Sequence, residues 1–264
     1  MFDKTAYINR RKSLMSKMQG GIVLILGNSN SPMNYKGNIY KFRQDSNFLY
    51  YFGLDHSGYA GLMDIDEGKE ILFADDLSID DIIWMGTQDS VKFQASQVGL
   101  SDTRPFDELY VYLKKAMADG RKIHFTPPYR GENMMLLEKL TGINSSETGQ
   151  AASVELIKAI VAQRSIKEPI EIEHIEDIMD VAFEMHTTAM SMAINGIYER
   201  EIAGAIEGIA LQHGGKVSFP IILSKRGETL HNEYHGNQLK KGDMLLCDMG
   251  FESEPFDYSS PEDE

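Results

Sequence analysis

The 264-residue sequence has little cysteine, no long apolar run and fewer basic than acidic residues. Its single cysteine, Cys247, excludes an intramolecular disulfide and favours a reducing compartment. The longest clean apolar run, Ile22–Leu26, is far too short to cross a bilayer, and the first residues lack the apolar stretch of a signal peptide. With 26 basic and 40 acidic residues the net charge is −14, which argues against nucleic-acid or anionic-membrane surfaces. We expect a cytoplasmic protein without nucleic-acid or membrane partners.

The composition that is present, 42% hydrophobic and 25% charged, is typical of a globular chain that buries a sizeable core. The first half alternates helical and strand-like segments, which predicts an α/β domain over residues 1–150. The predicted elements are helices at 7–18 and 106–117, strands at 22–26, 48–52 and 122–125, and a hairpin made of 61–65 and 70–73.

The character of the sequence changes after residue 150, and we expect residues 151–164 to link two domains. From Glu168 onward apolar residues recur every three or four positions, which predicts a long helix. A second helix is expected at 199–212, followed by strands at 217–223 and 244–247. These elements predict a second domain over 165–264.

Asp248 is the most informative single position. It follows the apolar run Met244–Cys247, which is typical of an interior strand, and it precedes Met249 and Gly250. A carboxylate at the end of a buried strand must be paired, hydrogen-bonded or metal-bound, because an isolated buried charge is costly. Taken alone, the residue also fits an aspartate that closes its own turn.

His231 and His235 precede Asp248 in a segment between Gly227 and Gly236 that has the composition of a loop. Histidines four apart can bind zinc on a helix, but this segment has Asn232 where the zinc motif requires glutamate. The two histidines are better suited to proton donation or substrate contact beside a strand-end carboxylate.

Several segments resemble the Xaa-Pro aminopeptidases of the aminopeptidase P and prolidase family. Phe42–Gly53, which begins phenylalanine-arginine-glutamine-aspartate, is similar to part of their N-terminal domain, as is the helix and strand pattern over 7–27. Arg164–Glu168 resembles the entry to their pita-bread catalytic domain. Thr229–His231 and Gly242–Gly250 resemble that domain's leucine-histidine loop and its first metal-ligand strand. The resemblance extends to about residue 252.

This resemblance implies an α/β domain of the creatinase and aminopeptidase P N-terminal type. It implies that the first, incomplete part of an α+β pita-bread catalytic domain follows. Members use two aspartates, one histidine and two glutamates to hold two divalent ions, commonly Mn²⁺, and cleave proline-containing peptides after the residue that precedes proline. By carry-over, Asp248 is a metal ligand, and His231 lies near the substrate and steadies the tetrahedral intermediate. The resemblance also implies a homo-oligomer for the full-length protein.

The sequence departs from the family after Asp248. The second aspartate ligand is expected eleven to thirteen residues later, where Ser259, Ser260 and Pro261 stand; Tyr258 matches the motif, but Asp257 and Asp263 fall outside that window. The histidine and the two glutamates do not follow. We therefore expect a C-terminally truncated member, inactive as an isolated chain because one carboxylate holds two ions poorly.

Other functions remain open at this point. A member of the same fold could bind peptides or proteins without catalysis, or hydrolyse its substrate without a metal, as creatinase does. The family also includes Xaa-Pro dipeptidases, and the sequence does not separate a dipeptide from a longer peptide substrate.

Overall fold

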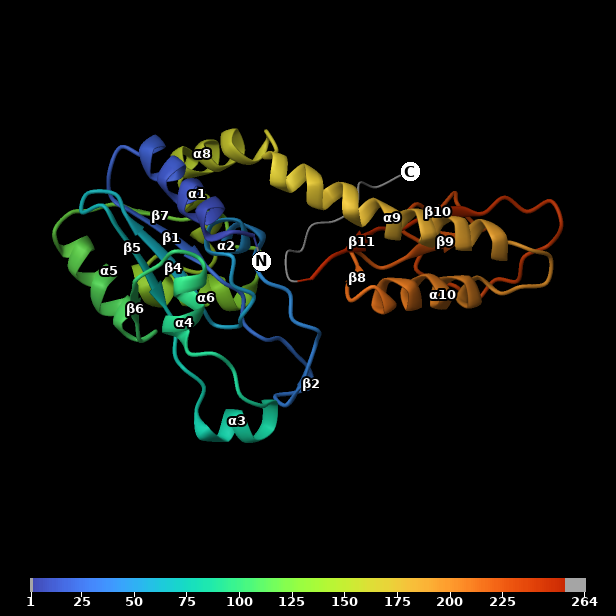
Figure 1. Cartoon of the computed structure of the whole chain (residues 1–264), viewed down its shortest axis with the longest axis horizontal. Helices are drawn as coiled ribbons and strands as arrows, with labels where there is room; N and C mark the ends of the chain where they lie inside the picture. Colours follow the sequence, from blue (N-terminus) through green and yellow to red (C-terminus); the bar gives the residue numbers. More distant parts are fainter. Residues whose placement is uncertain (1, 255–264) are drawn as a thin grey trace. The chain divides into compact units, whose positions relative to one another are not determined.

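The computed structural model of the chain describes residues 2–254 and divides into two compact units, Met1–Ile166 and Lys167–Glu264 (Figure 1). The helices of the first unit are α1 (Lys4–Lys17), α2 (Ser46–Phe52), α3 (Ile79–Met85), α4 (Val91–Gln97), α5 (Glu108–Ala118), α6 (Gly131–Thr141), α7 (Thr148–Ala151) and α8 (Val154–Arg164). Its strands are β1 (Ile22–Leu26), β2 (Pro32–Tyr35), β3 (Asn38–Ile39), β4 (Ala60–Asp64), β5 (Lys69–Phe73), β6 (Asp102–Arg104) and β7 (Ile123–His124).

A five-stranded mixed sheet organises the first unit, in the order β6-β5-β4-β1-β7. Strand β4 runs antiparallel to both β1 and β5, while the outer strands β6 and β7 run parallel to their neighbours. Because side chains alternate across a strand, β1 sends Val23 and Ile25 to a core beneath α1, α2 and α8, and Ile22 and Leu24 to a core beneath α5 and α6 (Figure 1). The sheet is therefore covered by helices on both faces.

The aromatic segment 48–52, which we expected to be a strand, is part of helix α2. Asp45 caps this helix because its Oδ1 accepts hydrogen bonds from the backbone N–H groups of Asn47 and Phe48, each at 2.9 Å. Gly53 ends it in the left-handed conformation, with φ of 63°. All five residues 48–52 are buried, so this part of the helix lies in the core on all sides and shows no amphipathic helical pattern, and its aromatic composition led to the wrong prediction of a strand.

The expected linker at 151–164 is also corrected, because most of it forms helix α8. Ser153 caps α8 through a hydrogen bond from the Leu156 N–H to its Oγ, at 3.3 Å. Leu156, Ala159 and Ile160 belong to the same core as α1 and α2. This segment is therefore an integral part of the first unit, whose compact fold continues to Ile166.

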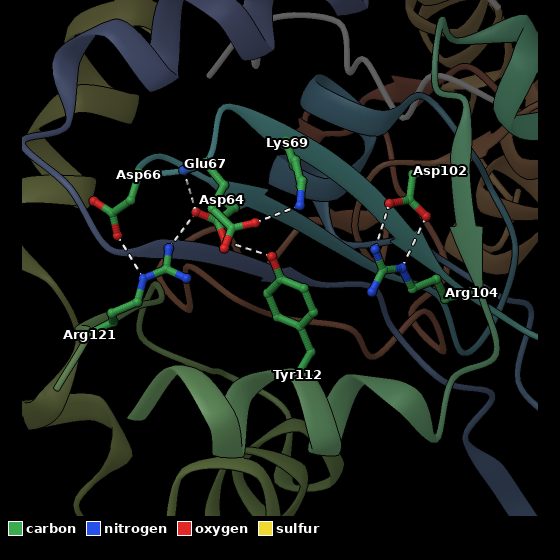
Figure 2. A network of polar contacts seen from close by, with 8 residues as sticks. All are labelled: Asp64, Asp66, Glu67, Lys69, Asp102, Arg104, Tyr112 and Arg121. Atoms are coloured by element: carbon green, nitrogen blue, oxygen red, sulfur yellow. Dashed lines mark hydrogen bonds and ion pairs between the residues drawn. The ribbon is translucent and has the colours of Figure 1, made fainter. Parts of the chain in front are cut away.

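A polar network joins the β4–β5 hairpin to α5 and to Arg121 (Figure 2). The side chain of Asp64 is fully buried and accepts hydrogen bonds from the Tyr112 hydroxyl, at 2.6 Å, and from the Arg121 guanidinium. Arg121 also pairs with Asp66 at 2.7 Å. Burial raises the pKa of Asp64, but the hydrogen bonds from Arg121 and Tyr112 outweigh it, so the pKa lies below its ordinary value. Each cation drawn in Figure 2 has a carboxylate partner, so the network serves the fold.

We predict that Tyr112→Phe lowers the free energy of unfolding by about 1.5 kcal/mol at pH 7, since it removes a hydrogen bond to a buried carboxylate. Because the folded-state pKa of Asp64 is lowered, the contribution is present above the unfolded value of about 4 and is lost as the pH falls through the folded value. Urea unfolding at several pH values should therefore show a deficit that shrinks in acid. Tyr110→Phe, on the exposed side of α5, is the matched control. A deficit that persists unchanged at acid pH would contradict the assignment.

Up to residue 254, where the described part of the second unit ends, it contains two long helices and four short strands. These elements are α9 (Pro169–Met192), α10 (Glu199–Gln212), β8 (Lys216–Val217), β9 (Ile222–Ser224), β10 (Leu246–Asp248) and β11 (Phe251–Glu252). Strand β9 pairs antiparallel with β10, and β8 with β11. The helices pack against each other and share one core with the strands, centred on Met185, Ile206 and Leu223 (Figure 1). Among residues 2–254, no helix has both the length and the apolar character needed to cross a membrane.

Candidate metal centre

Asp248 is the last residue of β10. Strand pairing sets it opposite Ile222 of β9, and the residues that follow it, Met249 and Gly250, are buried. Its Oδ1 atom is buried and has no hydrogen-bond partner among the described residues. An aspartate that closed its own turn would accept hydrogen bonds from nearby backbone N–H groups. A buried carboxylate oxygen without a partner lowers the stability of the fold. The unpaired Oδ1 is therefore better explained as a ligand atom for a cation, which would offset this cost.

The described residues supply one such carboxylate and no more. Within 2–254, no three histidine, cysteine, aspartate or glutamate side chains cluster closely enough to hold a metal ion. The neighbouring Cys247 is half-buried, and burial raises the pKa of its thiol to about 11, so it stays protonated near neutral pH. The window that the family pattern assigns to the second aspartate, around Tyr258 to Pro261, lies outside the described residues.

His231 lies in the segment that connects β9 to β10. We call residues 225–237 the His231 loop. The imidazole of His231 is exposed. His235, in contrast, is half-buried, and the Nε2 atom of His235 lies 2.9 Å from the carbonyl oxygen of Ile221. The loop begins directly after β9, and the chain then continues to β10, which pairs antiparallel with β9. His231 therefore lies in the connection between the two paired strands, and Asp248 lies at the end of the second strand. No hydrogen bond of the described structure joins Oδ1 of Asp248 to the imidazole.

An apolar groove of about 1040 Å³ lies beside β10. Its walls are Phe183, His186 and Met190 of α9 on one side and Met244, Leu246 and Cys247 on the other. His186, which the helical pattern suggests is a core residue, lies in this wall. Asp248, the next residue on the strand after Cys247, is not one of the residues that line the groove. The groove is consequently a neighbour of the candidate metal ligand and does not contain it.

Sequence reasoning missed one polar element of this region. Glu199, the first residue of α10, is fully buried and accepts hydrogen bonds from both ends of the His231 loop. The sequence around it signals only an acidic helix start, because its partners lie 25 to 38 residues away along the chain. Such long-range polar contacts leave no local pattern.

Two family models match the chain. The aminopeptidase P N-terminal domain matches residues 7–124, and metallopeptidase family M24 matches residues 173–259. Among curated relatives, the human Xaa-Pro dipeptidase is 26% identical over 246 residues, covering 88% of this chain and 48% of that protein. The rat Xaa-Pro aminopeptidase 3 is 23% identical, covering 88% and 47%. The chain thus spans about half the length of the curated relatives it matches.

The solved structures agree on the fold. Escherichia coli aminopeptidase P in its low-pH form superposes with a TM-score of 0.83 at 20% identity, covering 98% of this chain and 61% of that one. The expected fold class, an aminopeptidase P-type N-terminal domain followed by part of a pita-bread catalytic domain, is thereby confirmed. Together the two family models, over residues 7–124 and 173–259, support the aminopeptidase P and prolidase family of metallopeptidases for this chain.

Proposed function

We propose that this chain carries the N-terminal domain and the first metal-ligand strand of an Xaa-Pro aminopeptidase, which hydrolyses peptides after the residue that precedes proline. The observation that carries the proposal is the buried, unpaired Oδ1 of Asp248 at the end of β10, within the segment that matches the M24 metallopeptidases. A binding protein of the same fold would have no need of an unpaired carboxylate oxygen at that place.

The proposed metal is a pair of Mn²⁺ ions, with Asp248 as one ligand, because carboxylate oxygens suit hard divalent cations. Bound at a complete site, such ions supply a water-derived nucleophile for peptide hydrolysis. The role of His231 is to donate a hydrogen bond to the substrate oxygen that gains negative charge as the peptide bond is attacked. Its exposed imidazole on a fixed loop suits this contact, since it remains open to a bound peptide.

We also propose a cytoplasmic homo-oligomer. The exposed apolar side chains of α3 support self-association, since large exposed apolar patches mark interaction surfaces. Ile79, Ile83 and Trp84 are 78%, 72% and 86% exposed. The location rests on the single cysteine.

An Xaa-Pro dipeptidase is the second candidate. The human, orangutan, mouse and rat relatives that carry this name are 26 to 27% identical to the chain, slightly above the relatives named Xaa-Pro aminopeptidase, which are 23 to 25% identical. Parallel assays of an Xaa-Pro dipeptide and an Xaa-Pro-Yaa tripeptide distinguish the two, because a dipeptidase turns over the first and an aminopeptidase the second.

We predict no Mn²⁺-dependent turnover of either peptide by this chain alone, because residues 2–254, which the structure describes, supply one candidate carboxylate, and one carboxylate binds two ions too weakly. Metal-dependent turnover that Asp248→Asn abolishes would support the ligand and contradict the predicted inactivity. The function itself is tested in a longer polypeptide that joins this chain to the remaining ligand-bearing part of a metallopeptidase of this type. The proposal expects turnover by that polypeptide to require both Asp248 and His231. A longer, folded polypeptide without such activity would contradict the function.

A further inference from the structure

The second unit holds a buried carboxylate whose partners are all neutral. The side chain of Glu199 is fully buried at the start of α10, and no lysine or arginine of the described structure lies within ion-pair distance of it. Its oxygens accept hydrogen bonds from the Lys225 N–H at 2.8 Å, the Asn237 N–H at 3.1 Å and the Asn237 side-chain amide at 2.9 Å. The Ser224 hydroxyl adds a longer bond at 3.3 Å. These donors offset the cost of burying the charge.

The donors lie at the two ends of the His231 loop. Lys225 is the first residue of the loop and Asn237 is the last, so the Glu199 carboxylate connects the two ends of the loop. The backbone strengthens this closure, because the N–H groups of Glu199 and Arg200 donate to the carbonyls of Asn237 and His235, each at 3.0 Å. The loop is thereby attached to the rigid first turn of α10.

A second set of contacts runs from Glu199 towards His231. The Ser224 hydroxyl, which donates to Glu199, accepts a hydrogen bond from the side-chain amide of Asn232 at 3.1 Å. Asn232 is the residue next to His231, and its Oδ1 accepts from the Tyr234 N–H at 3.0 Å. Ser224 itself lies in β9 opposite Leu246, two residues before Asp248 on β10. These contacts therefore connect the segment that carries His231 to β9, and through strand pairing to β10, which ends at Asp248.

Helix capping does not account for Glu199. The capping role at this helix start belongs to Glu201, whose exposed carboxylate accepts from the Tyr198 N–H at 2.9 Å. A carboxylate that merely favoured the helix N-terminus could remain in solvent, as Glu201 does. Glu199, in contrast, is fully buried and accepts hydrogen bonds from both ends of the His231 loop, so its role concerns the loop and not the helix terminus.

We propose that Glu199 is a positioning residue that holds His231 in place relative to the Asp248 strand. The inference rests on the proposed function for the importance of His231, but the anchoring itself is a property of the fold. Carboxylates that accept several hydrogen bonds at once fix the geometry of the groups that donate them. Loss of the carboxylate should free the loop while the helices and the β9–β10 pair remain folded.

Hydrogen–deuterium exchange and histidine NMR of the full chain test this proposal. Glu199→Ala should accelerate exchange of peptides within 225–238 by about tenfold or more, with the α10 core around Ile206 unchanged, and should shift the His231 ring signal. Glu199→Gln, which retains one acceptor, should restore part of the protection. Glu201→Ala, on the same turn, should leave the loop and His231 as in the parent chain.

A second variant covers the case in which Glu199→Ala does not fold. Asn232→Ala leaves the buried carboxylate of Glu199 intact and should shift the NMR signal of His231. Peptides that contain the two ends of the loop, Lys225 and Asn237, should keep their protection from hydrogen exchange. Loop exchange equal to the parent in Glu199→Ala, uniform acceleration across the second unit, or an unshifted His231 in Asn232→Ala would each overturn the proposal. None of these measurements uses catalysis, so the anchoring can stand even if the peptidase function fails.

Discussion

Replacement of Arg11 by methionine should destabilise the first unit by about 3–5 kcal/mol, the largest loss that we expect from a single substitution. The guanidinium is fully buried and donates to Glu70 at 3.0 Å and to the backbone carbonyls of Tyr51 and Val98, both at 2.9 Å. These bonds connect α1 to α2, to β5 and to the end of α4. Methionine fills the space but leaves a carboxylate and two carbonyls without their donor, and breaking a buried charged pair costs about this much.

Urea unfolding followed by circular dichroism measures this loss. Lys12→Met, at the adjacent exposed position of α1, is the matched control and should change stability by less than about 0.5 kcal/mol. Arg11→Lys should also destabilise the unit, because a single ammonium cannot reproduce the planar fork that reaches three acceptors. A loss below about 1 kcal/mol for Arg11→Met would show that water replaces the guanidinium and would contradict the account of this core.

The second large effect has the opposite sign. Asp248→Leu should stabilise the second unit of the metal-free chain by about 2 kcal/mol, because it removes a buried oxygen that has no partner among the described residues. Residues retained for binding are often unfavourable for the fold that carries them. Calorimetry, with exchange of the 244–252 peptides to identify the unit that changes, measures the gain.

Asp243→Leu is the matched control for this substitution. Asp243 is exposed, accepts from the Lys240 N–H at 2.8 Å and pairs with Lys225 at 3.2 Å, so its loss should leave stability unchanged or slightly lower. If Asp248→Leu destabilised the unit by more than Asp243→Leu, Asp248 would be a structural aspartate and the metal-ligand assignment would be wrong.

Local sequence signals predicted the parts of the fold that depend on local patterns. The strand Ile22–Leu26 and the helix Glu199–Gln212 have the bounds that their apolar spacing indicates, and the hairpin of β4 and β5 forms around the predicted turn. The prediction of a strand at 48–52 was wrong, because the helix caps Asp45 and Gly53 outweigh the strand preference of the aromatic residues between them.

The candidate site was only partly accessible from sequence. The apolar run before Asp248 signalled a strand-end carboxylate, and the structure shows that its Oδ1 is unpaired. The support of the His231 loop by Glu199 could not be predicted, because it depends on contacts between residues 25 to 38 positions apart. Burial of a charged side chain at a helix start becomes visible only when the fold closes over it.

Paramagnetic broadening by Mn²⁺ tests the assignment of Asp248 most directly. We predict that sub-stoichiometric Mn²⁺ broadens the amide signals of Met249 and of Ile222 across the strand pair before those of the acidic surface. Binding should be weak, with a dissociation constant above about 1 mM, since even multi-carboxylate sites reach this range. Asp248→Asn should retain these signals at the same Mn²⁺ concentration. Equal broadening in the parent chain and in Asp248→Asn would contradict the claim that this carboxylate is a metal ligand.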